Sequence, residues 1–150
     1  MTKRQVLLES ISALLIMLFL YASVSKFLDF EHFRREMNNQ PFPNEYTPFL
    51  IWAVPLTEIG ISVSLLFERT RMIGLIASLI LMTAFTIYAI LILLHFFKYV
   101  PCSCGGVISK LTWHQHLVFN LFFVTISILA IVLQRHKSLT SIIITKNSFV

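Results

Sequence analysis

The sequence predicts an all-α integral membrane protein: a four-helix transmembrane bundle with a short interfacial helix between its first and second helices. Hydrophobic residues make up 57% of the chain and charged residues only 13%, whereas soluble domains carry about 25% charged residues. The mean hydropathy is +0.80. At about 1.5 Å per residue, four apolar runs are each long enough to cross a ~30 Å hydrocarbon core as helices. These runs are residues 6–25, 49–67, 72–94 and 117–133.

The first run has two features of a secretory signal. Lys3 and Arg4 precede it, and small residues end it. Three more spans follow, and a bundle without its first helix would lose much of its packing surface. We therefore interpret residues 6–25 as the first helix of a four-span domain covering residues 1–137. The tail, residues 138–150, has no predicted structure or role.

A short amphipathic helix is predicted after the first span. Apolar side chains recur there at helical spacing while charged side chains fill the other faces. The apolar residues are Phe27, Phe30, Phe33 and Met37. Such a helix lies at the membrane surface. Pro41 and Pro43 should end it, because proline lacks a backbone donor and disfavours helical geometry in the preceding residue.

The second and third spans should be antiparallel neighbours, because only residues 68–71 join them. Small residues recur four positions apart in each span, at Gly60 and Ser64 and at Gly74 and Ser78. Small residues let helix backbones approach closely inside a membrane. We therefore expect both pairs to lie at helix interfaces.

Glu58 lies near the middle of the second span, where a carboxylate is costly unless it is protonated, paired or facing a wet cavity. We expect it to point into the bundle. Two interpretations stay open: a proton-relay or ligand-binding group, or a neutral acid bonded to Ser62 or a neighbouring helix. Lys26 could reach this carboxylate only if the bundle is tilted favourably.

The fourth span begins with a polar face that should point into the bundle. Its members share three-and-four spacing. They are Trp113, His116, Asn120 and Ser127. His116 and Asn120 either orient something bound beneath the preceding loop or make ordinary hydrogen bonds between helices.

The only two cysteines lie one residue apart, in Pro101-Cys102-Ser103-Cys104-Gly105-Gly106. A bridge closing so short a loop contributes about 1.6 kcal/mol by chain entropy, against about 3 kcal/mol for fifteen residues. The proline and glycines disfavour a helix there. A strained, easily reduced bridge is typical of a redox pair. Redox exchange is therefore the favoured interpretation, and two others stay open.

Metal binding is the second interpretation, since Cys102, Cys104, His114 and His116 supply soft sulfurs and imidazoles. The spacing argues against it. One residue separates the two cysteines and one separates the two histidines, whereas structural zinc sites usually have two to four residues between paired cysteines and three to five between paired histidines. We therefore predict no metal. In the third interpretation the thiols are small buried apolar groups.

Charge distribution gives a weak indication of topology. With the N-terminus in the cytoplasm, seven Lys and Arg residues fall on the cytoplasmic side and five on the other. We therefore predict cytoplasmic termini and an extracytoplasmic Cys102 to Cys104 loop, where thiols meet oxidants. No basic stripe suggests a nucleic-acid partner; the lipid bilayer is the expected surrounding.

The chain resembles the MauE/DoxX type of redox-associated small membrane protein. The likeness rests on residues 21–26 running into Asp29-Phe30, on Pro55-Leu56-Thr57-Glu58, and on the cysteine motif before the fourth span. It implies a bacterial inner-membrane protein connected with disulfide formation or with maturing a cysteine-rich periplasmic partner. Nothing in the residues points to methylamine metabolism itself.

Quinone-linked disulfide generators, including the vitamin K epoxide reductase type, resemble the chain only in architecture. Those proteins relay electrons through two thiol pairs, whereas this chain has one pair. Either a bound quinone is reduced directly, or a separate thioredoxin-like protein supplies the second pair. The sequence does not choose between them, so a quinone cofactor stays open.

We therefore expect thiol–disulfide exchange with an extracytoplasmic thioredoxin-like or cysteine-containing protein. Cys102 and Cys104 would be the reacting residues. The supporting residues would be His116, His114, Asn120 and Glu58. The alternative is a non-enzymatic membrane subunit or assembly factor that docks on a larger complex. The sequence leaves open whether the chain is an enzyme.

Overall fold

The structure is a computed structural model that describes residues 2–41, 43–96 and 112–147. Over these ranges the chain is helical, without strands. The elements are α1 (Lys3–Leu28), α2 (Phe30–Asn38), the 3₁₀ turn η1 (Asn44–Tyr46), α3 (Thr47–Leu66), α4 (Arg71–Leu93) and α5 (Trp113–Asn147). Four of the described helices are long and apolar enough to cross a membrane. The chain is thus a multi-pass membrane protein, and the predicted fold class is confirmed.

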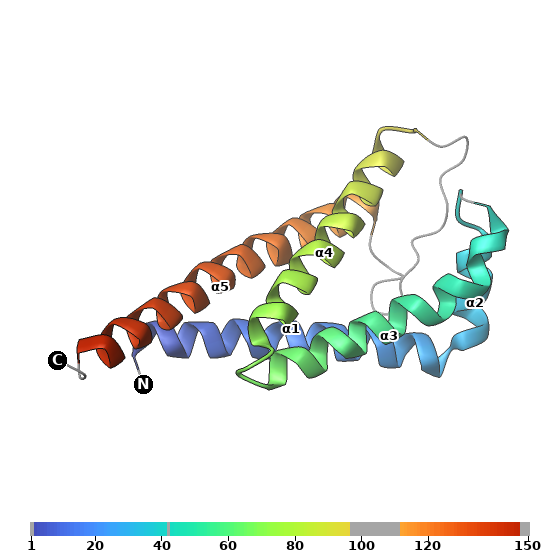
Figure 1. The fold of residues 1–150 in the computed structure, drawn as a ribbon. Helices are drawn as coiled ribbons and strands as arrows, with labels where there is room; N and C mark the ends of the chain where they lie inside the picture. The colour runs from blue at the N-terminus through green and yellow to red at the C-terminus, as the bar shows by residue number, and fades with distance from the viewer. Residues whose placement is uncertain (1, 42, 97–111, 148–150) are drawn as a thin grey trace.

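The four long helices form a ring in which α1 contacts α3 and α5, and α4 contacts the same two helices. The first turns of α1 and the last turns of α5 lie at the same end of the molecule (Figure 1). We call this the termini end. The opposite end carries α2, the start of α3 and the end of α4 (Figure 1). We call this the α2 end.

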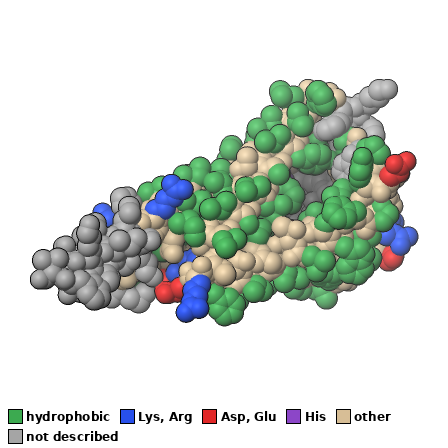
Figure 2. Space-filling view, in the orientation of Figure 1, with side chains coloured by type: hydrophobic (Ala, Val, Ile, Leu, Met, Phe, Trp, Pro, Cys, Tyr) green, Lys and Arg blue, Asp and Glu red, His purple; other side chains and the backbone are tan. Residues whose placement is uncertain are grey.

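The outer surface suits a lipid environment. Figure 2 shows hydrophobic side chains along α3 and α4, with charged side chains gathered toward the two ends. Large apolar residues such as Met17 and Phe49 are exposed, as expected of side chains that face acyl chains. The interior is built from residues at three-and-four spacing, for example Leu8, Ile11 and Leu15 on α1.

α2 is held at its end of the bundle by a shared cap. The Asp29 backbone N–H donates to the Ser25 carbonyl and closes α1, while the Asp29 side chain accepts from the His32 backbone N–H and opens α2. The apolar side of α2 then buries Phe33 and Met37 against α3. The predicted short amphipathic helix is confirmed.

One of the two predicted small-residue contacts is present. A Cβ added to Gly74 would lie 2.9 Å from Leu65 side-chain atoms and 3.0 Å from the Leu65 backbone nitrogen, so α3 and α4 meet at this glycine. Ser78, one turn on, is fully buried. Gly60 has nothing within 4 Å of an added Cβ. The prediction for Gly60 was wrong, because residue spacing alone does not say which face of α3 meets a neighbour.

A salt bridge ties α1 to α4 at the termini end. The Arg71 guanidinium donates to both carboxylate oxygens of Glu9, at 2.8 and 3.2 Å. Arg71 is buried, whereas Glu9 is partly exposed. This fork-like pairing holds the start of α4 against the first turns of α1.

α4 ends in a Schellman motif. The Phe96 N–H donates to the Leu91 carbonyl and the His95 N–H to the Ile92 carbonyl. His95 adopts the left-handed conformation, with φ 53°. The helix therefore stops at the α2 end of the bundle.

α5 continues beyond the apolar run, residues 117–133, that predicted its span. The helix extends to Asn147 and so includes most of the tail for which no structure was predicted. Neither proline nor glycine occurs in residues 113–147, so the chain carries no strong helix breaker there.

Candidate functional site: a membrane cavity beside a buried ion pair

A cavity of about 300 Å³ lies toward the α2 end of the bundle, and all five helices contribute side chains to it. Its walls are mostly apolar and rich in aromatic rings. The aromatic residues are Phe19, Phe33, Phe85, Tyr88, Trp113 and Phe119. The volume is at the lower end of the range for small-molecule pockets, about 300 to 1,000 Å³. One ring system fits such a space better than a whole phospholipid.

A buried ion pair forms one wall of the cavity. The Lys26 Nζ donates to the Glu58 carboxylate oxygens at 2.8 and 3.1 Å and to the Ala22 carbonyl at 3.2 Å. Lys26 is 7% exposed and Glu58 1%. The ammonium has three N–H donors, and these three acceptors account for them. The pair brings no net charge into the apolar interior, which is how a membrane protein accommodates such residues.

This pairing decides between the structural alternatives for Glu58. The carboxylate bonds to Lys26, whereas the Ser62 hydroxyl donates to the Glu58 backbone carbonyl at 3.0 Å. Of the two contacts expected for a structural acid, the one with Ser62 is not formed by the carboxylate, and the one with a neighbouring helix is made to Lys26 of α1. The inward orientation of Glu58 is confirmed.

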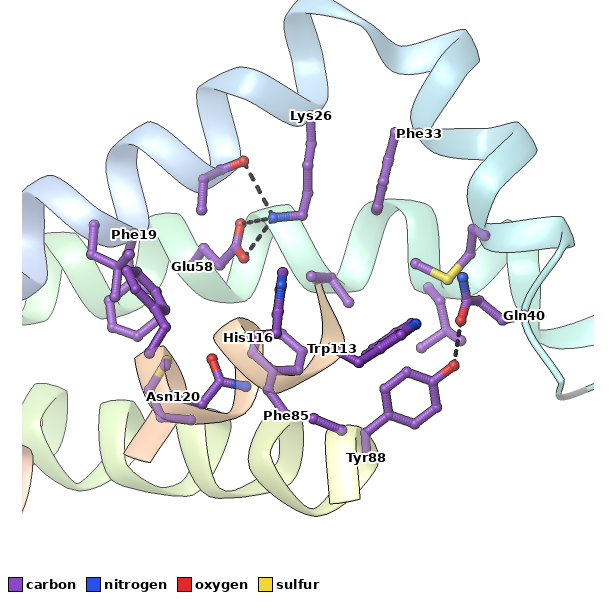
Figure 3. A pocket seen from close by; sticks show the side chains of 18 residues that line it. Phe19, Lys26, Phe33, Gln40, Glu58, Phe85, Tyr88, Trp113, His116 and Asn120 are labelled. Carbon is purple, nitrogen blue, oxygen red and sulfur yellow. Dashed lines mark hydrogen bonds and ion pairs between the residues drawn. The ribbon is translucent and has the colours of Figure 1, made fainter. Parts of the chain in front are cut away.

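The opposite wall carries two polar side chains from α5. Asn120 is 4% exposed, and His116 is half-buried. Both project from α5 toward the Lys26–Glu58 pair (Figure 3). Nδ1 of His116 is buried without a hydrogen-bond partner. The described part of the chain gives the Asn120 amide no partner either.

A third polar contact lies at the side of the cavity nearest α2. The Tyr88 hydroxyl donates to the Gln40 side-chain carbonyl, and the Gln40 amide donates to the Glu36 carbonyl at 3.0 Å. Figure 3 shows Trp113 between His116 and Tyr88. The Trp113 ring lies edge-on to Tyr88, with centroids 6.2 Å apart. This contact connects α4 to the segment after α2.

The structure brings together three of the predicted site residues: Glu58, His116 and Asn120 all line the cavity. His114 is exposed and is not among the residues that line the cavity. Cys102 and Cys104 lie outside the described residues. Within the described ranges, no group of three or more His, Cys, Asp or Glu side chains could hold a metal ion.

The sequence indicated Lys26 only as a conditional partner of Glu58, and it did not assign Gln40 or Tyr88 to a site. For Lys26 a signal existed, because a cation within reach of a mid-span carboxylate is its natural partner. For Gln40 and Tyr88 there was none. Gln40 follows the short helix, and Tyr88 reads as one aromatic among many in an apolar run.

The fold and cavity together define a small multi-pass membrane protein whose helices surround a ligand-sized space at one end. The chain belongs to the MauE family, because residues 4–133 match the family described as Methylamine utilisation protein MauE. No curated protein and no solved structure showed a significant match.

Proposed function

We propose that this MauE-family protein is a membrane accessory protein that exchanges thiols and disulfides with an extracytoplasmic partner through Cys102 and Cys104. The observation that supports the proposal is where the cysteine segment is attached. The segment follows α4, which ends at Leu93, and precedes α5, which begins at Trp113. Both helices line the cavity near these ends, through Tyr88 and Trp113. The two thiols are thus tethered to the end of the bundle that carries buried polar groups.

The exchange conserves atoms and electrons. A partner thiolate attacks one sulfur of a Cys102–Cys104 disulfide, forming a mixed disulfide and releasing the other cysteine as a thiolate. A second partner thiol then displaces the mixed disulfide. The partner loses two electrons and two protons, and the two cysteines gain them. The reverse sequence reduces the partner.

His114 has a supporting role in this proposal. It is exposed in the first turn of α5, the described turn nearest in sequence to the cysteines on that side. A protonated imidazole there would stabilise a thiolate. Glu58, His116 and Asn120, which line the cavity, would also support the exchange.

The proposal needs an oxidising compartment on the side of the cysteines. We propose the inner membrane of a bacterium, with both termini in the cytoplasm and the cysteine segment outside it. The weak excess of Lys and Arg on the side of the termini supports this orientation. The partner would be a thioredoxin-like or other cysteine-containing protein.

Single cysteine variants provide the test. In Cys102→Ser or Cys104→Ser protein the remaining thiolate can attack a partner disulfide and release one partner thiolate, but no neighbouring thiol is present to resolve the mixed disulfide, so it should accumulate. A reducing agent should cleave this mixed disulfide. The adduct is detected by non-reducing electrophoresis of membranes from intact cells and is identified by mass spectrometry.

The control uses the fact that the chain has no other cysteine. Cys102→Ser/Cys104→Ser protein must give no adduct, and the unaltered protein should alternate between thiol and disulfide when oxidant and reductant are added. Permanently reduced, unreactive cysteines would refute the exchange. If the double variant also leaves partner thiols unchanged, the chain is a non-enzymatic subunit or assembly factor.

A further inference from the structure

We infer that the cavity binds a neutral, lipid-soluble ring compound whose ring oxygens hydrogen-bond to Asn120 and His116. The inference rests on described residues alone and does not depend on the cysteines. It goes beyond thiol exchange by giving the bundle interior a ligand of its own.

The charge of the ligand follows from the wall formed by Lys26 and Glu58. All three donors of the ammonium have acceptors, two of which are the carboxylate oxygens. A charged ligand would bring an uncompensated charge among membrane-spanning helices, which is strongly unfavourable. The occupant is therefore neutral.

Asn120 and His116 indicate which polar groups the ligand carries. Asn120 is more than nine-tenths buried, lines the cavity and has no hydrogen-bond partner in the described part of the chain. His116 also lines the cavity, and its imidazole has no hydrogen-bond partner in the described part of the chain. Leaving a buried amide unsatisfied is costly, so such groups are usually paired. An amide and an imidazole can each donate or accept, so a carbonyl or a hydroxyl oxygen would satisfy them.

The other residues that line the cavity indicate that the ligand contains a flat ring. Aromatic side chains from several helices surround the space, including Phe85, Tyr88 and Trp113. Flat rings stack favourably on such side chains. A cavity of about 300 Å³ holds a ring system with a short substituent. A quinone or quinol head group combines neutrality, a flat ring and ring oxygens.

Trp113 provides a direct test, because it lines the cavity and the only other tryptophan, Trp52, is half-exposed on the outer face of α3. Full-length Trp52→Phe protein in lipid nanodiscs is titrated with decylubiquinone, whose quinone ring quenches nearby tryptophan. We expect saturable quenching of Trp113. Trp113→Phe protein, which keeps Trp52, should show only weak, non-saturating quenching.

Removing the proposed hydrogen bond should weaken binding. In the Trp52→Phe background, Asn120→Leu should raise the apparent Kd about five- to tenfold. Thr125→Val, on the exposed face of the same helix, should leave it unchanged. Circular dichroism checks that each variant is folded.

A competition experiment keeps the inference testable even if Asn120→Leu does not fold. Decylbenzene carries the same tail without ring oxygens and should not relieve the quenching at equal mole fraction. Equal competition by decylbenzene would overturn the inference and indicate an apolar chain as the occupant. An absence of saturable quenching would also overturn it. Because binding does not involve the thiols, Cys102→Ser/Cys104→Ser protein should bind decylubiquinone normally, whatever the outcome of the exchange experiments.

Discussion

Lys26 and Glu58 depend on each other for their place in the bundle interior. Each would be an isolated charge among apolar side chains without the other, and the distances of 2.8 and 3.1 Å satisfy both at once. Breaking a buried pair by removing one partner is commonly destabilising by about 3 to 5 kcal/mol, whereas replacing both partners is often close to neutral. Replacing either residue alone should therefore destabilise the bundle more than replacing both.

We predict this non-additivity for Lys26→Met and Glu58→Gln. Each single variant should lower the free energy of unfolding by a few kcal/mol, and the double variant should recover most of the loss. Thermal or denaturant unfolding in detergent measures all three. Additive losses would mean that the two residues act independently.

The structure also explains how far these residues could be predicted from the sequence. The inward orientation of Glu58 follows from the cost of a charge in lipid. Its partner does not, because Lys26 lies in the last turn of α1 while Glu58 lies well inside α3. Hydropathy does not indicate how α1 and α3 tilt against each other, so it does not say which residues of the two helices lie at the same depth.

At the scale of elements, Gly74 sets how closely α3 and α4 approach. Alanine is the better helix former by about 1 kcal/mol, but a Cβ at Gly74 would collide with Leu65 at 2.9 Å. Overpacking of this kind typically costs about 1 to 3 kcal/mol. The steric cost should therefore exceed the gain in helix propensity.

Gly60 provides the matched control for this prediction. We expect Gly74→Ala to lower the Tm and Gly60→Ala to leave it unchanged or raise it, because an added Cβ at Gly60 meets nothing within 4 Å. Parallel thermal unfolding of the two variants makes the comparison. Equal effects would show that the α3–α4 contact does not limit stability.

The end of α4 offers a stabilising substitution. His95 has a φ of 53°, a conformation that costs most non-glycine residues about 1 to 2 kcal/mol. His95→Gly should therefore stabilise the protein by about 0.5 to 1 kcal/mol, after allowance for the greater freedom of glycine in the unfolded chain. The expected rise in Tm is about 2 °C.

The neighbouring residue is the control for that substitution. Leu94 has a φ of −78°, so glycine relieves no strain there. Leu94→Gly should lower the Tm. A lower Tm for His95→Gly as well would mean that the imidazole itself stabilises the cap.

For the whole molecule, the structure makes a prediction about topology. The first turns of α1 and the last turns of α5 lie at the same end (Figure 1), and four helices can cross the membrane. Reporters fused to either terminus should therefore report the same compartment. Under the proposed orientation, a reporter active only in the cytoplasm should be active at both termini, and one inserted at Glu45, before α3, should be inactive. The reverse pattern would refute the proposed orientation and, with it, extracytoplasmic exchange.

The bundle was more predictable than its cavity. Four spans follow from run length and hydropathy, and α2 follows from the spacing of Phe33 and Met37, because both signals are local. The shared face of His116 and Asn120 follows from helical periodicity. The cavity arises where five helices meet, and no single segment encodes it. The assignment of Gly60 failed for the same reason.

The two ion pairs of α1 also bear on the order of assembly. Glu9 and Lys26 lie on α1, which is synthesised before the helices that carry their partners, α4 and α3. Nascent α1 thus exposes two unneutralised charges until Glu58, and then Arg71, emerges from the ribosome. Until that point, burial of α1 in the hydrocarbon core is unfavourable, which favours a position beside the insertion machinery or at the lipid surface. Once both partners have arrived, α1 is tied to α4 near its start and to α3 near its end.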